Sequence, residues 1–196
     1  MILKALAFDF GHTLMDEQKD RMTAIESRPV HLMPYVLEVL PALALPLAIW
    51  ANTRTAREAE LRRWLDRAGI EQFFSWVVTS VDAGCRKPAR EFFDFALGKC
   101  AVNKEEILLV GNQLNTDVKG GEAYGIRTVW LSGPAYRSAD ETLSPNDVRP
   151  SYTISTLREL PALINRSAIP KCAPELSGSR SLRQRPGMHA LTKHKA

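Results

Sequence analysis

Asp9 is the first residue of the chain whose type and position suggest chemistry. It follows an apolar run, residues 2–8, and Gly11 stands two positions after it. The run is typical of a buried strand, and a glycine at that place is typical of a turn. Because open α/β sheets bind ligands at the carboxyl ends of their parallel strands, the first element is expected to present a carboxylate where a ligand binds.

Three further segments carry polar or charged side chains beside apolar stretches. They are Leu47-Ala48-Ile49-Trp50-Ala51-Asn52, Gly84-Cys85-Arg86-Lys87-Pro88 and Leu108-Leu109-Val110-Gly111-Asn112-Gln113-Leu114-Asn115-Thr116-Asp117-Val118-Lys119-Gly120-Gly121. Each segment alone is a weak signal. Four such segments in one chain, each next to a predicted strand, helix or turn, indicate one site that is assembled from several loops.

Predicted strands and helices alternate along the chain. Apolar runs typical of strands lie at residues 2–8, 45–50, 76–79, 107–110 and 128–131. Helical patterns lie at residues 35–44, 56–68, 88–97 and 116–124, and residues 151–164 are expected to form a short strand and a helix over 156–163. This alternation predicts an α/β fold in which helices flank a parallel sheet with right-handed crossovers.

Local signals set the expected ends of two helices. Thr55 and Glu58 form a capping-box pattern at the start of the helix over 56–68. Pro41 is expected to kink or shorten the helix over 35–44, because proline removes a backbone donor and clashes with the preceding turn.

The composition of the 196-residue chain is that of one globular domain, with 45% hydrophobic and 24% charged residues. No apolar run approaches the roughly 18 residues of a membrane span, and no secretory signal is recognised at the start. We therefore expect a cytoplasmic protein without a membrane segment. The cysteines lack metal-ligand spacing and are expected to be reduced thiols; they are Cys85, Cys100 and Cys172.

The positive charge is concentrated at the end of the chain. The net charge is +4, but residues 166–196 hold seven basic residues and one acidic residue, which leaves residues 1–165 at −2. We expect residues 1–165 to form the folded domain and residues 166–196 to be a disordered basic tail, because the tail has few large apolar side chains. The charge gives no support to nucleic-acid binding by the folded domain.

In their order and spacing, the four segments resemble the motifs of the haloacid dehalogenase (HAD) superfamily over residues 1–165. The resemblance implies a Rossmann-like HAD domain in which an aspartate attacks phosphorus and water then cleaves the aspartyl-phosphate. It also implies Mg²⁺ as the cofactor, which with a lysine neutralises the phosphoryl oxygens. The implied ligand is a phosphorylated small molecule or macromolecule, and a protein partner stays open.

The resemblance gives a role to each matching residue. Asp9 is implied to be the nucleophile, and Lys87 the catalytic partner of the nucleophile and the phosphate. Asn52 is implied to help hold the phosphate, and His12 is assigned to the substrate-binding side of the site. The implied metal ligands are Asp9, the backbone carbonyl of Gly11, Asn112 and Asp117.

Three positions depart from the family pattern. Family phosphatases have a second aspartate, the general acid and base, where this chain has Gly11. A phosphate-binding hydroxyl is replaced by Ala51, and a metal-binding aspartate by Asn112, which is a poorer ligand for a hard cation. Acid–base assistance is typically worth ~10²–10⁴-fold in rate, so weak phosphatase activity is expected.

The loop after Asp9 holds groups that could replace the missing acid. His12 comes directly after Gly11 and titrates in the right pH range, and Asp16 and Glu17 follow on the same loop. The other interpretation of His12 is a turn histidine that faces solvent or caps backbone groups.

Two other functions stay open. A catalytically silent homologue would bind a phosphorylated ligand or a protein partner through the same cleft. A dehalogenase-like hydrolase would use Asp9 to attack carbon without metal, but that branch has a large helical cap after the first motif. Only about 30 residues separate Leu14 from Leu45, so we expect no large cap domain and an open site. An open site suits a macromolecular substrate or a partner that supplies a lid.

Overall fold

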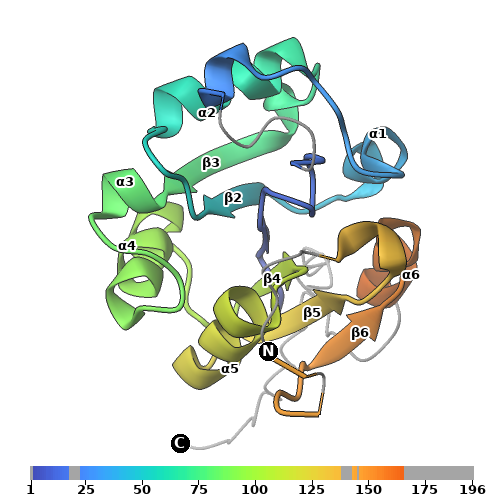
Figure 1. Cartoon of the computed structure of the whole chain (residues 1–196). Helices are drawn as coiled ribbons and strands as arrows, with labels where there is room; N and C mark the ends of the chain where they lie inside the picture. Colours follow the sequence, from blue (N-terminus) through green and yellow to red (C-terminus); the bar gives the residue numbers. More distant parts are fainter. Residues whose placement is uncertain (1, 18–22, 138–142, 145, 166–196) are drawn as a thin grey trace, which may run out of the picture.

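Six parallel strands form one sheet at the centre of the computed structural model (Figure 1). The strands are β1 (Ala5–Phe8), β2 (Leu47–Ala51), β3 (Phe74–Thr79), β4 (Ile107–Gly111), β5 (Arg127–Leu131) and β6 (Tyr152–Ile154). They lie in the order β3-β2-β1-β4-β5-β6, and all neighbouring pairs are parallel. The predicted α/β fold with a parallel sheet flanked by helices is therefore confirmed.

The structure describes residues 2–17, 23–137, 143–144 and 146–165. The predicted basic tail, residues 166–196, lies outside the described residues, as does Cys172. Cys85 and Cys100 are free thiols. None of the described helices combines the length and the apolar character needed to cross a membrane.

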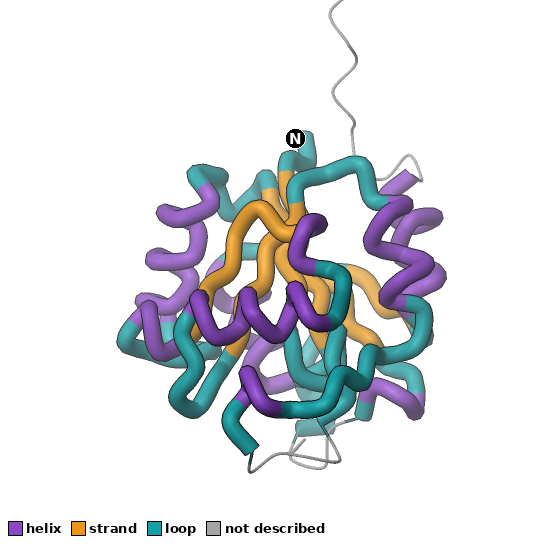
Figure 2. Tube along the Cα trace, turned by 90° about the horizontal axis from the view of Figure 1, so that it is seen from above, coloured by secondary structure: helices purple, strands orange, loops and turns teal. Residues whose placement is uncertain are grey.

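Successive side chains of the strands enter two separate apolar cores. In β1, Leu6 and Phe8 belong to one core, and Ala5 and Ala7 belong to the other, because side chains alternate across a strand. Figure 2 shows the strands between the helices that cover them. The first core is covered by α1 (Val36–Val39), α2 (Glu58–Arg67) and α6 (Leu160–Asn165), and the second by α3 (Ser80–Ala83), α4 (Arg90–Cys100) and α5 (Gly120–Tyr124).

β1 lies in the middle of the sheet, where the direction of the strand order reverses. β2 is its neighbour on one side and β4 its neighbour on the other. Such a reversal opens a crevice beyond the carboxyl ends of the strands, and ligands bind there in open α/β sheets. Asp9, Asn52 and Asn112 directly follow β1, β2 and β4, so all three lie at this crevice.

The connections at the two sides of β1 hold only short elements where they are described. Residues 9–46 include the 3₁₀ turns η1 (Ile25–Ser27) and η2 (Leu40–Ala42) on either side of α1, and residues 80–106 include α3 and α4. Pro41 lies in η2, directly after the short α1, so the predicted shortening of this helix is confirmed. The absence of a large cap domain stays a prediction, because residues 18–22 lie outside the described part.

The start of α2 differs from the prediction. Its N-cap is Arg57, whose backbone N–H donates to Oε2 of Glu60 at 2.9 Å. The N–H of Glu58 donates to Asp82, which lies on the neighbouring α3, at 2.7 Å. The predicted capping box of Thr55 and Glu58 is therefore wrong, because a carboxylate from another element fixes the helix start.

The helix predicted over 116–124 consists of two parts. A π-helical turn, η4 (Leu114–Lys119), precedes α5, and the N–H of Val118 bonds to the carbonyl of Gln113 at 3.2 Å, five residues back. Such turns are rare and occur frequently at functional sites. The other short turns are η3 (Glu71–Phe73), η5 (Pro134–Tyr136) and η6 (Leu157–Glu159), the last of which precedes α6.

Gly120 allows α5 to pack closely on the loop that carries Lys87. A Cβ on Gly120 would lie 2.8 Å from Cβ and 3.1 Å from Cα of Pro88. We expect Gly120→Ala to lower the free energy of unfolding by about 1–3 kcal/mol, because the overpacked loop has to shift. Urea unfolding followed by circular dichroism measures this change.

Gly98 provides the matched control for this substitution. It lies on an exposed part of α4, and a Cβ there would meet nothing within 4 Å. Gly98→Ala is expected to raise the free energy of unfolding by roughly 0.5–1 kcal/mol, because alanine favours the helix. Equal effects of the two substitutions would contradict the packing argument.

Candidate active site

Lys87 is buried between two carboxylates at the carboxyl edge of the sheet. Its Nζ lies 2.8 Å from Oδ1 of Asp9 and 2.7 Å from Oδ1 of Asp117. The side chains of Lys87 and Asp117 are essentially inaccessible, whereas that of Asp9 remains 12% exposed. We call these three residues the Asp9–Lys87–Asp117 triad. The fold thus brings together the predicted nucleophile, the predicted lysine and one predicted metal ligand.

Burial and charge oppose each other within the triad. Burial favours a neutral lysine, but the charges of Asp117 and Asp9 raise the pKa of Lys87 above its usual value. Burial and the nearby charge of Asp9 raise the pKa of Asp117 to about 6, although Lys87 acts to lower it. The ammonium of Lys87 is thus the charge that opposes the rise in the pKa of Asp117.

The end of β4 and the π-helical turn position Asp117. The backbone N–H of Gln113 donates to Oδ2 of Asp117 at 3.1 Å, and the hydroxyl of Thr116 lies 3.4 Å from its Oδ1. Gly111 has no side chain in the space that the carboxylate occupies, and a Cβ there would collide with Asp117. The glycine at the end of β4 is therefore needed for the carboxylate to pack against the strand.

Asn52 holds the backbone of Lys87. Its Nδ2 donates to the carbonyl of Lys87 at 2.9 Å, and its Oδ1 accepts the backbone N–H of Lys87 at 2.9 Å. Asn52 also lines the cavity described below. This amide therefore fixes the loop that carries the lysine, and its predicted contact with the phosphate stays a prediction.

Asn112 is part of a hydrogen-bond chain that reaches Asp9 through Thr13. The hydroxyl of Thr13 lies 3.2 Å from Oδ1 of Asn112 and 3.5 Å from Oδ2 of Asp9. Nδ2 of Asn112 donates to the carbonyl of Tyr136 at 2.7 Å. Asn112 is buried, and it does not contribute to the described cavity lining. The Asn112 amide thus links the end of β4 to Tyr136 and Thr13. Thr13 is a site residue that was not predicted from the sequence.

His12 forms the turn after the nucleophile. Its φ of 55° is in the left-handed region, and its backbone N–H donates to the carbonyl of Met15 at 2.6 Å. The side chain is 4% exposed and is absent from the described cavity lining. The imidazole is thus buried within the turn, and the predicted substrate contact of His12 stays a prediction.

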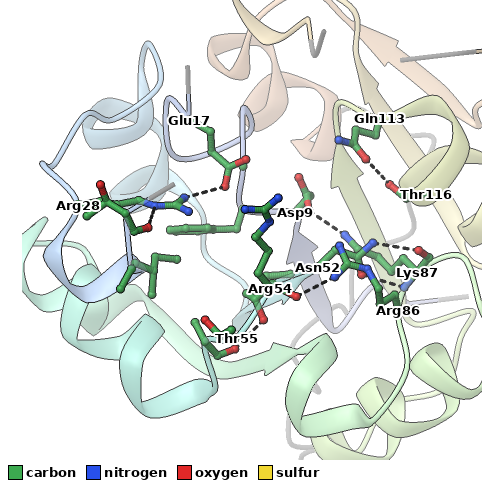
Figure 3. Close-up of a pocket in the computed structure, with 18 of the residues that line it drawn as sticks. Asp9, Glu17, Arg28, Asn52, Arg54, Thr55, Arg86, Lys87, Gln113 and Thr116 are labelled. Atoms are coloured by element: carbon green, nitrogen blue, oxygen red, sulfur yellow. Dashed lines mark hydrogen bonds and ion pairs between the residues drawn. The ribbon is translucent and has the colours of Figure 1, made fainter. Parts of the chain in front are cut away.

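A cavity of about 910 Å³ opens at the exposed side of Asp9 (Figure 3). In Figure 3, the side chains of Arg54 and Glu17 lie between Arg28 and Asp9. Gly11 and Ala51, two of the positions that depart from the family pattern, also line the cavity. Its charged lining residues, among those described, are Asp9, Glu17, Arg28, Arg54, Arg86 and Lys87. Four cationic side chains and two carboxylates make this cavity suitable for an anionic ligand.

Two of the arginines could have been found from the sequence. Arg54 stands two residues after Asn52, and Arg86 directly precedes Lys87, so both are neighbours of motif residues. Nη1 of Arg86 donates to the carbonyl of Thr53 at 2.9 Å, which fixes its guanidinium at the cavity wall. Arg28 is remote from every motif, and only the tertiary structure brings it to the site.

The donor atoms around Asp9 fit a hard cation. The carboxylates of Asp9 and Asp117 both lie within 2.8 Å of Lys87 Nζ, and the Gly11 carbonyl and the Asn112 amide oxygen stay predicted ligands. Mg²⁺ commonly takes one or two carboxylates and keeps several waters, so this set is sufficient. Among the described residues, no group of three or more His, Cys, Asp or Glu side chains could hold a metal, which does not fit a structural zinc site.

Comparison with known proteins identifies the family. A protein-family model described as HAD-hydrolase-like matches residues 84–160. The chain is 32% identical over 101 residues to the pyrimidine 5'-nucleotidase YjjG of Escherichia coli (strain K12), which covers 51% of this chain and 42% of that protein. It is 32% identical over 130 residues to the glyceraldehyde 3-phosphate phosphatase of Methanocaldococcus jannaschii, with 66% and 53% covered. The chain thus spans about half the length of these curated relatives.

A solved structure has the same fold. A crystal structure of an uncharacterized protein from Listeria monocytogenes serotype 4b superposes with a TM-score of 0.71 at 26% identity. The superposition covers 83% of this chain and 97% of that chain. The chain belongs to the HAD-like hydrolase superfamily.

The triad predicts a pH-dependent loss of stability when Lys87 is replaced. We expect Lys87→Met to lower the free energy of unfolding at pH 8, in EDTA, by about 3–5 kcal/mol, because two buried carboxylates lose their cation. Without the lysine, the native pKa of Asp117 should rise further above its unfolded value, because Lys87 acts to lower it. Protonation of Asp117 then removes the penalty as the pH falls, so the deficit should be smaller at pH 5 than at pH 8.

Urea unfolding at both pH values measures this difference. Lys4→Met is the matched control, because Lys4 forms a surface ion pair with Glu106 at 2.6 Å and its side chain is 57% exposed. Its loss is expected to cost at most about 1 kcal/mol. A Lys87→Met deficit that is the same at pH 5 and pH 8 would contradict the argument.

Proposed function

We propose that the protein is a phosphatase that hydrolyses phosphate esters through Asp9. The single observation that carries this proposal is the buried Lys87 ammonium between Asp9 and Asp117, at the floor of a cavity with cationic walls. The lysine pairs with the Asp9 carboxylate and orients it, and this side chain remains partly accessible from the cavity. An ionised, oriented carboxylate is what nucleophilic attack on phosphorus requires.

The residues of the site divide the work of the reaction. An oxygen of Asp9 attacks phosphorus, and water afterwards cleaves the acyl phosphate that forms. Lys87 stabilises the negative charge on the transferring phosphoryl group while it keeps Asp9 in place. Mg²⁺, held by Asp9, Asp117, the Gly11 carbonyl and Asn112, would neutralise phosphoryl oxygens when bound.

The cavity supports a small phosphorylated substrate with a further polar or anionic part. Its volume of about 910 Å³ is ample for a small organic phosphate. Arg28 and Arg54 add positive charge to the cavity lining. The two curated relatives are named for a pyrimidine 5'-nucleotide and for glyceraldehyde 3-phosphate, both of which are phosphorylated small molecules.

We expect the wild-type protein to hydrolyse p-nitrophenyl phosphate with Mg²⁺, and Asp9→Asn to abolish turnover. An amide is no nucleophile, so the rate should fall at least about 10³-fold, to background. Release of p-nitrophenolate and of inorganic phosphate measures the rate. Asp66→Asn is the matched control, because Asp66 is exposed on α2 and far from the motif residues in sequence.

The outcomes of this assay are decisive for the proposal. Turnover that Asp9→Asn abolishes, that Asp66→Asn retains and that EDTA removes would support it. No turnover by the wild-type protein with Mg²⁺, Mn²⁺ or Co²⁺ would refute it.

Weak Mg²⁺ binding is a further expectation, and Asn112→Asp tests it. A third carboxylate should lower the Mg²⁺ concentration at half-maximal activity on the order of tenfold, because ligand charge sets the affinity for hard cations. The same variant should lose about 1–3 kcal/mol of stability without metal, because its carboxylate faces the carbonyl of Tyr136. A Mg²⁺ titration of the turnover rate measures the first effect, and thermal unfolding without metal measures the second.

Asn115→Asp is the charge-matched control for this experiment. Asn115 is exposed and lines the same cavity, so its substitution adds a negative charge without touching Tyr136. It should leave the metal-free stability within about 0.5 kcal/mol of the wild type. If Asn112→Asp fails to tighten Mg²⁺ binding, position 112 is not a metal ligand.

A second candidate function is a silent homologue that binds a phosphorylated ligand. The observation that favours it is the hydrogen bonding of Asn112 to Tyr136 and Thr13, which uses this amide structurally. In that case the wild-type protein would bind inorganic phosphate by calorimetry and hydrolyse neither aryl phosphates nor, as a test of a dehalogenase, 2-haloacids.

A further inference from the structure

The cavity holds a carboxyl group in the space beside Gly11. A Cβ on Gly11 would lie 2.6 Å from Cδ and 2.7 Å from Oε2 of Glu17. The Glu17 carboxyl thus occupies the place where a side chain of residue 11 would begin, two residues after Asp9. Glu17 and Asp9 supply the only carboxylates of the described cavity lining.

The turn after Asp9 brings Glu17 to this place. The N–H groups of Leu14 and Met15 both donate to the carbonyl of Phe10, at 2.9 and 3.0 Å. Met15 forms bridges to Gly11 and to Leu32, which fix the returning chain on both sides. The loop therefore folds back on itself, and Glu17, which follows the loop, returns to the cavity beside Gly11.

Arg28 contacts the Glu17 carboxyl within the cavity (Figure 3). Its Nη1 lies 3.4 Å from Oε1 of Glu17, and its Nε donates to the carbonyl of Thr23 at 2.8 Å. Arg67 donates to the carbonyl of Arg28 at 2.9 Å. The Glu17 side chain is 26% exposed and lines the cavity, and its Oε1 contacts the arginine.

The proposed reaction needs a proton donor in the cavity, near Asp9. An alkoxide is a poor leaving group, so cleavage of an alkyl phosphate requires a proton for the departing oxygen. Lys87 is committed to two carboxylates, and the His12 side chain does not line the cavity. Glu17 is the remaining acid of the described lining.

We propose that Glu17 is the general acid and base of this enzyme, an inference that rests on the proposed phosphatase function. In the first step, Asp9 forms a bond to phosphorus, the phosphorus–oxygen bond to the leaving group breaks, and the Glu17 carboxyl gives its proton to that oxygen. In the second step, water attacks phosphorus and gives a proton to the Glu17 carboxylate. The bond between Asp9 and phosphorus breaks, inorganic phosphate leaves, and both carboxyl groups return to their initial states.

Glu17→Gln tests this assignment with two probes whose leaving groups differ. The leaving group of glycerol 2-phosphate is an alkoxide, which needs the proton. Turnover of this substrate should therefore fall by about 10²–10⁴-fold. p-Nitrophenolate leaves without a proton, so the first step should remain fast and the second should become slow. We therefore expect a rapid release of one equivalent of p-nitrophenolate per enzyme, followed by slow turnover. Glu91→Gln, on an exposed position of α4, is the matched control and should behave as the wild type.

A transfer of the carboxyl group to residue 11 provides the second test. Gly11→Asp alone would crowd Glu17, because a Cβ there already meets its carboxyl. Combined with Glu17→Ala, the same substitution has room for its carboxyl group. The double variant should recover at least about tenfold of the glycerol 2-phosphate turnover that Glu17→Ala loses. A purely structural role of Glu17 would not be rescued in this way.

The possible results separate this proposal from the function on which it rests. Unchanged turnover of both probes by Glu17→Gln would overturn the role of Glu17 and leave the phosphatase intact. Loss of turnover without a burst, unrestored in the double variant, would overturn it as well. If the wild-type protein hydrolyses neither probe with Mg²⁺, the phosphatase function itself fails.

Discussion

The buried ion pairs of Lys87 are the interaction on which the rest of the site depends. An ammonium group in the protein interior is costly unless anions compensate it, and here Asp9 and Asp117 lie at 2.8 and 2.7 Å. Burial and the charge of Asp9 raise the pKa of Asp117, and the charge of Lys87 acts to lower it. The same contacts that compensate the charges also orient the Asp9 carboxylate, so stability and reactivity have one origin.

The surrounding backbone is arranged to make these contacts possible. Asn52, after β2, holds both backbone groups of Lys87, and the π-helical turn after β4 presents Asp117. Gly111 and Gly120 permit close approaches that a Cβ would block. These residues belong to different strands and loops, so the triad forms only when β1, β2 and β4 are paired in register.

The departures from the family pattern have different structural consequences. The carboxyl group of Glu17 occupies the space where a side chain of residue 11 would begin. The folded loop brings this carboxyl group back to the cavity. The amide at Asn112 is hydrogen bonded to Thr13 and to the carbonyl of Tyr136. Ala51 has no hydroxyl, and the nearby Thr53 and Thr55 also line the cavity. The site is thus altered at three places, and the proposed compensation applies to one of them.

The sequence by itself determined the order of strands and helices, the parallel sheet, and the loops that carry Asp9, Lys87 and Asp117. Those features follow from local patterns, because apolar runs, glycines and prolines act over a few residues. It did not determine the start of α2, which a carboxylate of Asp82 fixes from a neighbouring helix, nor the π-helical turn.

The tertiary structure alone decided which side chains face the cavity. His12 and Glu17 stand five positions apart on one loop, and only the folded turn buries the imidazole and exposes the carboxyl group. Arg28 reaches the site from a segment without any motif. The physical reason is that burial and ion pairing depend on contacts between residues that are distant in sequence. The spacing of residues along the chain does not predict those contacts.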